Sequence, residues 1–215
     1  MIQINYPFLG PLSFEKYYDI YVETYNIAEP ESRQWWAQNI KPSWNIIDVG
    51  ANIGQYTVQF AMMAPQGQVY AFEPTTTFEF LKTNISNLQL SNVHLFKIAV
   101  GNTNENKIDN ILKIHQTGTF ENDMFDFITL DSFVKANDLT INAIKIDVDG
   151  FDYEVLLGCK NMLTTQNPIV VCEINGACLQ TRGFTEQDIY NFFNEVNYYQ
   201  ERQLDYENFV FKAKK

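Results

Sequence analysis

The chain has 215 residues, and 15 Lys and Arg residues against 26 Asp and Glu residues give it a formal net charge of −11. This length corresponds to about one domain, and a composition that is 46% hydrophobic and 15% aromatic can fill a sizeable core. The negative charge disfavours nucleic acid as a partner, and the absence of a long apolar run, a secretory signal pattern and a cysteine framework predicts a cytoplasmic protein with no membrane partner.

The predicted elements begin with two helices, at residues 14–26 and 31–40, with Pro30 and Pro42 at boundaries. We therefore expect residues 1–43 to be a helical segment that packs on the same domain as residues 44–215. Alternating strands and helices follow, with strands at 44–49, 68–73 and 93–98 and helices at 55–64 and 76–88. This alternation is typical of parallel βαβ units covered on both faces.

A polar stretch at residues 101–126 interrupts this rhythm and predicts a hairpin or loop excursion of the kind that often carries function. The rhythm resumes with a short helix opened by Asp131. Thr185 and Asp188 resemble a capping box that starts a helix reaching Val196. The remaining predicted elements are strands at 143–147, 169–173, 198–203 and 208–212, and a helix at 152–163. We expect an α/β fold with an open, mostly parallel sheet whose last pair is antiparallel.

The segment from Asp48 to Gly54 reads as a strand end, a glycine-containing turn and a helix start, a geometry suited to cofactor binding. It is not a three-glycine dinucleotide motif, because Asn52 stands where the middle glycine would clear space for a pyrophosphate. A carboxylate at Asp48 would repel a pyrophosphate but suits a ligand with an ammonium group.

Glu73 ends the second strand and lies 19 residues beyond Gly54. At this spacing an acidic side chain reaches a ribose diol in nucleoside-binding α/β folds. Pro74 stops the strand and turns the carboxylate toward the crevice. The loop and Glu73 together indicate an adenosine-type ligand.

Several spaced motifs occurring in order resemble the FkbM family of S-adenosylmethionine-dependent methyltransferases. They are Asp48-Val-Gly-Ala-Asn-Ile-Gly54, Phe72-Glu73-Pro74, Ala99-Val100-Gly101, Thr129-Leu130-Asp131 and Ile144-Lys-Ile-Asp147-Val-Asp149-Gly150 through Gly158. The resemblance implies a Rossmann-like seven-stranded methyltransferase fold with the final strand antiparallel. It also implies O-methylation of sugars or other hydroxylated metabolites, with S-adenosylhomocysteine as the product of the cofactor.

The resemblance also assigns the cofactor site. It implies that Glu73 takes the ribose, with Pro74 beside it, and that the backbone near Ala99 edges the adenine. Asp48 would assist the ammonium group. The methionine part would be lined by Gly50, Ala51, Asn52 and Gly54. The family pattern has Glu where this chain has Asp149 and Asp152, so charge is kept while the reach of each side chain falls by one methylene.

Asp147 and Asp149 follow the fourth strand, beside the point of the sheet where ligands bind in open α/β folds. We expect Asp147, with Asp149 second, to be catalytic; Glu173 ends the next strand in the equivalent place. Helix capping and a divalent cation remain alternatives, so a metal site is left open.

The histidines and Cys178 are weaker candidates. We expect His94 to be structural, while His115 in the excursion could accept a proton near neutral pH. Nothing near Cys178 in the sequence would lower its pKa. Two other functions remain open: a non-catalytic nucleoside-binding module, and a nucleotide-dependent oxidoreductase. The acceptor, a small molecule or a glycan, and the oligomeric state are not specified by the sequence.

Overall fold

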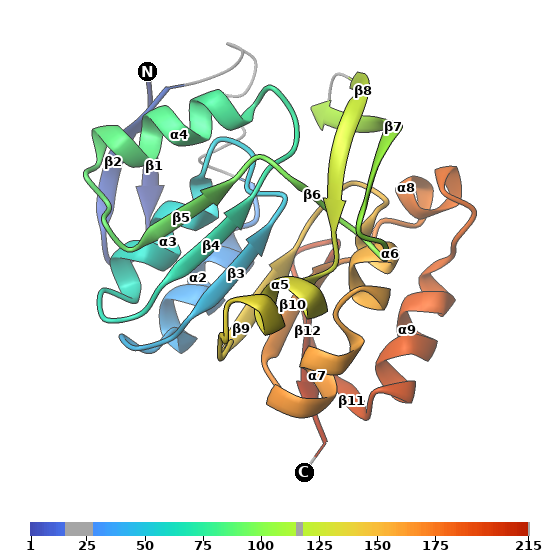
Figure 1. Cartoon of the computed structure of the whole chain (residues 1–215). Coiled ribbons are helices and arrows are strands. Elements are labelled where there is room, and N and C mark those ends of the chain that lie inside the picture. The colour runs from blue at the N-terminus through green and yellow to red at the C-terminus, as the bar shows by residue number, and fades with distance from the viewer. Residues whose placement is uncertain (16–27, 115–117, 215) are drawn as a thin grey trace.

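The computed structural model describes residues 1–15, 28–114 and 118–214, and a seven-stranded sheet forms the centre of this part of the chain (Figure 1). The sheet order is β11-β12-β10-β9-β3-β4-β5. All neighbouring pairs are parallel except β10–β12 and β11–β12. The strands are β3 (Ile46–Val49), β4 (Val69–Phe72), β5 (Val93–Phe96), β9 (Ala143–Ile146), β10 (Ile169–Glu173), β11 (Tyr198–Leu204) and β12 (Asn208–Ala213). The predicted α/β class with an antiparallel last pair is confirmed.

Helices cover both faces of this sheet, and strand side chains alternate between the two covers. Ile47 and Val49 pack in one apolar cluster with α5, α6, α7 and α9, whereas Ile46 packs with α2 and α3 on the other face. The helices on the first face are α5 (Leu130–Ala136), α6 (Asp152–Leu157), α7 (Lys160–Gln166) and α9 (Glu186–Glu195). On the opposite side lie α2 (Pro30–Asn39), α3 (Gln55–Met63) and α4 (Phe78–Asn87).

The predicted helix at 152–163 is divided into α6 and α7, and Asp131 makes hydrogen bonds to both sides of this division. The carbonyl of Gly158 accepts a hydrogen bond from the Asp131 N–H, and the Asp131 carboxylate accepts from the N–H groups of Asn161 and Met162. Asp131 therefore caps α7, and the N-cap of α5 is Thr129. The capping box of Thr185 and Asp188 is confirmed at the start of α9.

The N-terminal segment differs from its prediction. Residues 2–14 form a hairpin of β1 (Ile2–Tyr6) and β2 (Gly10–Phe14), where the sequence predicted no strand in a helical segment. Burial alternates residue by residue along β1, the period of a strand, and Ile4 packs with α3 and α4. Most of the predicted helix at 14–26 lies outside the described residues, while the helix at 31–40 is confirmed as α2.

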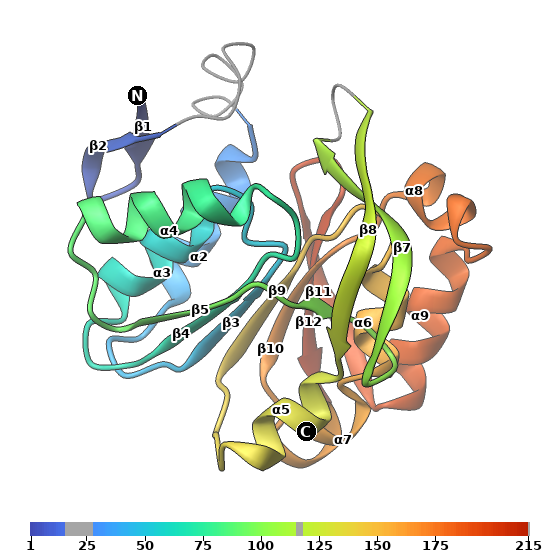
Figure 2. The same cartoon turned by 45° about the horizontal axis from the view of Figure 1, so that its top comes forward.

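The predicted excursion is a long hairpin of β7 (Glu105–Ile114) and β8 (Thr119–Ile128), joined to the short strand β6 (Ala99–Val100). Figure 2 shows it projecting from the body beside α8 (Gly176–Thr181). Arg182, at the end of α8, forms ion pairs with Asp109 of β7 and with Glu154 of α6. The hairpin is thereby attached to the carboxyl-end side of the sheet.

Candidate functional site

A cavity of about 160 Å³ lies at the carboxyl ends of β3, β4 and β9, beneath the hairpin. All predicted site residues except Gly54 line it: Asp48, Gly50, Ala51, Asn52, Glu73, Pro74, Ala99, Asp147 and Asp149. Loops that follow adjacent parallel strands meet at this edge, which explains why residues so far apart in the chain converge.

The loop between β3 and α3 requires unusual backbone at two positions. Gly50 has φ 81°, and a Cβ there would lie 1.8 Å from the Asp147 carbonyl oxygen, so only glycine lets the loop pass the end of β9. Asn52 has φ 49°, a conformation that asparagine tolerates better than most residues. Gly54 is the N-cap of α3 and supports the loop from outside the cavity.

Glu73 is 7% exposed and joins this loop to the one that follows β4. Its Oε2 accepts from the Asn52 N–H at 3.0 Å, and its Oε1 accepts from the Thr75 N–H at 3.0 Å and the Thr75 hydroxyl at 2.6 Å. Burial raises the pKa of Glu73, while these hydrogen bonds oppose the shift. A carboxylate offers about four acceptor positions. Glu73 can therefore still accept a hydrogen bond from a ligand.

Two polar atoms beside the loop are buried and unpaired. Asp48 is fully buried, and its Oδ2 accepts from the Thr57 hydroxyl at 2.5 Å. Within the described part of the chain, neither Asp48 Oδ1 nor the amide nitrogen of Gln55 has a hydrogen-bond partner, although both residues line the cavity. An unpaired acceptor and an unpaired donor on residues of the same cavity lining suit a ligand that carries both an ammonium and a carboxylate group.

A second part of the cavity lining, its apolar end, consists of hydrophobic side chains. It is formed by Phe72 of β4, by Ala99 with its neighbours Ile98 and Val100, and by Ile111 and Phe127 of the hairpin. Ala99 and Val100 pair with Phe127 and Ile128 of β8, which fixes the hairpin against this wall. A flat aromatic ligand group fits such a slot.

Lys145 and Glu29, which the sequence analysis missed, complete a charged wall near Asp147. Lys145 is 3% exposed, and its Nζ lies 2.6 Å from Asp147 Oδ2. Glu29, half-buried just before α2, accepts from the Tyr56 hydroxyl at 2.7 Å and from the Asn208 amide at 2.9 Å. A charged residue in the apolar run Ala143-Ile144-Lys145-Ile146 was a signal for Lys145. The sequence around Glu29 shows no comparable signal.

The turn after β9 carries Asp147 and Asp149, and both residues line the cavity. Asp149 has φ 47° and Gly150 has φ 105°, so the chain turns sharply here. Asp152 is fully buried and does not line it; its carboxylate accepts from the N–H groups of Val148 and Gly150 and so holds this turn. Burial, reinforced by Asp147, raises the pKa of Asp152 to about 7.

Glu173 ends β10 but is not among the residues that line the cavity. Burial, followed by the nearby Asp147 and Asp152, raises its pKa well above the ordinary range. In the described residues, no group of three or more His, Cys, Asp or Glu side chains is arranged to hold a metal ion.

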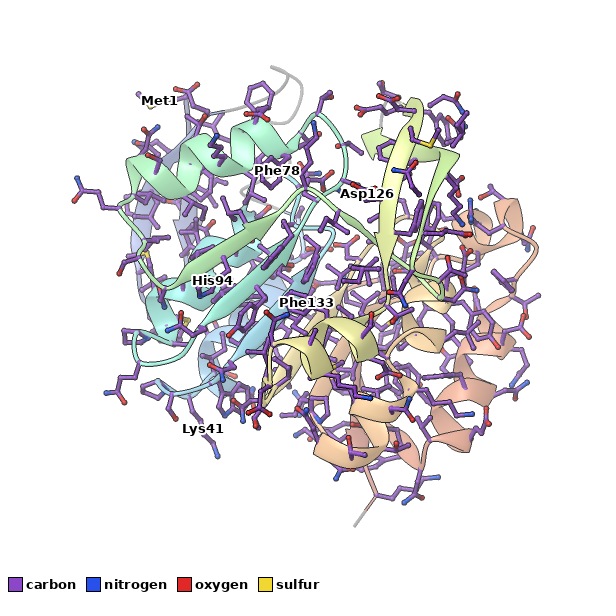
Figure 3. All side chains as sticks on the ribbon, viewed as in Figure 1. Met1, Lys41, Phe78, His94, Asp126 and Phe133 are labelled. Carbon is purple, nitrogen blue, oxygen red and sulfur yellow. The ribbon has the colours of Figure 1, made fainter. Side chains whose placement is uncertain are left out.

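The remaining candidates either do not line the cavity or lie outside the residues that the structure describes. His94 lies on β5, as Figure 3 shows, where it is exposed, hydrogen-bonds to Gln68 and stacks on Tyr70. His115 lies outside the described residues. Burial raises the pKa of the Cys178 thiol to about 11. Over the described ranges, no helix is long and apolar enough to cross a membrane.

Comparison with known proteins agrees with this geometry. Residues 48–206 match the family described as the methyltransferase FkbM domain, which spans the loop, Glu73 and the β9 turn. No curated protein matches the chain significantly.

Solved structures share the fold at low sequence identity. The methyltransferase FkbM of Methylobacillus flagellatus KT has a TM-score of 0.59 at 12% identity, over 81% of this chain and 44% of that one. The present chain thus spans less than half of that protein. A Clostridium thermocellum structure named as an rRNA methylase has 0.57 at 13% identity, over 85% and 94%. A Streptococcus mutans structure named as a methyltransferase, in complex with S-adenosylhomocysteine, has 0.54 at 15% identity, over 84% and 93%.

Proposed function

Because the chain belongs to the methyltransferase FkbM family, we propose that it binds S-adenosylmethionine in the cavity and methylates a hydroxyl group of a sugar or another small hydroxylated metabolite. The observation that carries this proposal is the division of the cavity. One part of its lining holds the unpaired Asp48 Oδ1 and Gln55 amide nitrogen, and another part is apolar. Glu73 also lines the cavity and accepts a hydrogen bond from the loop that follows β3.

The residues of the cavity match the parts of this cofactor. Asp48 would accept from the ammonium group, and the Gln55 amide would donate to the carboxylate. Glu73 would accept from the ribose hydroxyls, while Ala99 and Phe127 would enclose the adenine. Gly50, Ala51 and Asn52 supply a loop that a ligand can approach closely, and Pro74 ends β4 beside Glu73.

Asp147 is assigned to the acceptor. The bound cofactor supplies an activated methyl group on a positively charged sulfur, so the protein mainly has to place the acceptor oxygen and receive its proton. Asp147 would accept a hydrogen bond from the hydroxyl and then its proton, with Asp149 as the second candidate for this role. A divalent cation between carboxylate and hydroxyl is the alternative route.

A small acceptor is favoured by the net charge of −11, which repels phosphate backbones. Some similar structures are named as rRNA methylases, so the exclusion of nucleic acid stays a prediction of the sequence, as do the cytoplasmic location and a function without membrane partners.

Calorimetry with S-adenosylhomocysteine and with NAD, followed by transfer of a labelled methyl group to a panel of sugars and RNA, tests the proposal. We expect S-adenosylhomocysteine to bind, NAD not to bind, and label to appear on a hydroxylated small molecule. Binding of NAD alone would identify an oxidoreductase. Cofactor binding without transfer to any acceptor would favour the non-catalytic module.

A further inference from the structure

Lys145 lies at a covered position of a parallel strand, where a charge is costly unless it is paired. It stands beside Asp48 in the sheet register, and its Nζ contacts Asp147 Oδ2 at 2.6 Å. The same Nζ lies 4.7 Å from the centre of the Tyr56 ring, within range of a cation–π interaction.

The groups that face Lys145 come from each element packed around it. They are Asp48 on β3, Asp147 at the end of β9, Tyr56 on α3 and Glu29 before α2. Three of these four are carboxyl groups, so one cation compensates several buried or half-buried negative charges. The ordinary outcome of burying carboxylates together is that some of them take up a proton.

We propose that Lys145 is a positioning residue, the resident cation that keeps Asp48 ionised for the ammonium end of the cofactor and fixes Asp147 by one oxygen, leaving the other oxygen for the acceptor hydroxyl. This inference rests on the proposed function. Asp147 Oδ1 makes no hydrogen bond within the described residues, and the side chain of Asp147 is 26% exposed in the cavity.

The electrostatics of the site agree with this role. Burial alone would lower the pKa of Lys145, but the facing carboxylates outweigh burial and raise it. Lys145 therefore stays protonated and cannot serve as the base. Burial raises the pKa of Asp48, and Lys145 is the largest opposing influence. Removing the ammonium should thus leave Asp48 protonated over a wider pH range.

The test is calorimetric binding of S-adenosylhomocysteine to wild type and Lys145→Met between pH 5 and pH 9. We expect the affinity of the variant at pH 7 to fall by about tenfold or more, since a charge-assisted hydrogen bond to Asp48 is lost when Asp48 is protonated. As the pH is lowered, the affinity of the variant should begin to fall at a higher pH than the affinity of wild type does. Lys145→Arg should retain most of the affinity, and Lys160→Met, which removes an exposed ion pair with Glu195, should match wild type.

If Lys145→Met does not fold, a second pair of variants tests the same role of Lys145. Asp147→Asn should bind S-adenosylhomocysteine nearly as wild type does, whereas Lys145→Met/Asp147→Asn should bind more weakly at pH 7 and recover at higher pH. Equal binding and equal pH profiles with and without Lys145 would overturn the inference alone. Failure of wild type to bind S-adenosylhomocysteine would overturn the proposed function together with this inference.

Discussion

The two ends of the cavity are built in different ways. The apolar end consists of hydrophobic side chains from β4, β6 and the hairpin, and Ala99 and Phe127 in it meet through pairing of β6 with β8. At the charged end, Asp48, Lys145 and Glu29 come from three separate parts of the chain. Its side chains are held by hydrogen bonds and ion pairs.

This difference predicts different sensitivities. Apolar contacts are numerous and individually weak, so single changes at that end should have graded effects. Buried charges depend strongly on their partners, so loss of one partner at the charged end should have a large effect that varies with pH.

The largest effect is expected for Asp147→Asn, which keeps the shape of the side chain but removes its basic site. Turnover on an authentic acceptor should fall by about 10²–10⁴, the range typical of general-base loss, while cofactor affinity changes little. Steady-state kinetics with parallel calorimetry measures both quantities.

A chelator titration of wild type separates the two routes for the proton. Direct transfer to Asp147 is insensitive to chelator, whereas a cation-assisted route is abolished and is restored by added divalent ion. Wild-type turnover by both Asp147→Asn and Asp149→Asn would show that these carboxylates serve only as caps.

The second prediction concerns pH, through Asp152. Because burial raises its pKa from 3.8 to about 7, the folded state holds this proton more tightly than the unfolded chain does. Its stabilising contribution is complete below pH 3.8 and is lost as the pH rises through about 7. Each pKa unit corresponds to about 1.4 kcal/mol. Urea unfolding at several pH values should show this decline, and Asp152→Asn should flatten it; parallel curves for the two proteins would contradict the assignment.

The third prediction concerns Glu73, at the junction of the two ends. Glu73→Ala removes a charged acceptor for ribose hydroxyls, each such bond being worth roughly 1.5–3 kcal/mol, so affinity for S-adenosylhomocysteine should fall at least about tenfold. Circular dichroism checks that the fold is kept, and Glu79→Ala, an exposed change on α4, is the matched control. Unchanged affinity would mean that the ribose is held elsewhere.

The smallest effect is expected at the apolar end. Asp109→Asn weakens the ion pair that ties β7 to Arg182, while Arg182 keeps its contact with Glu154. Because Ile111 of the same strand lines the cavity, affinity for S-adenosylhomocysteine should fall, but by less than about tenfold, the factor that corresponds to 1.4 kcal/mol. A loss as large as that of Glu73→Ala would show that the hairpin controls cofactor binding more than the loop does.

The sequence predicted the parts of this molecule that depend on local pattern. The βαβ order, the β3–α3 loop and the capping box of Thr185 could be inferred because periodicity and turn chemistry are local properties. The β1 strand was missed although the apolar Ile2, Ile4 and Tyr6 alternate with polar residues, which is the period of a strand. Asp131 could not be recognised as the cap of α7, because that contact crosses about thirty residues of chain.

Only part of the charged end was predicted, because some of its contacts join residues that are far apart in the chain. Asp48 and Asp147 were identified because they follow strands, where ligands of α/β sheets bind. The charge of Lys145 within an apolar strand was a local signal, but its position beside Asp48 becomes evident only when β3 and β9 are known to be neighbours in register. Glu29 depends on a tertiary contact with Tyr56 and Asn208 that no local pattern announces.

The most direct test of the central claim is a crystal structure of the protein with S-adenosylhomocysteine. We expect the ribose hydroxyls within hydrogen-bond distance of Glu73, the ammonium nitrogen at Asp48 Oδ1 and the adenine between Ala99 and Phe127. Binding outside this cavity, or in it with the adenine at the charged end beside Lys145, would contradict the claim.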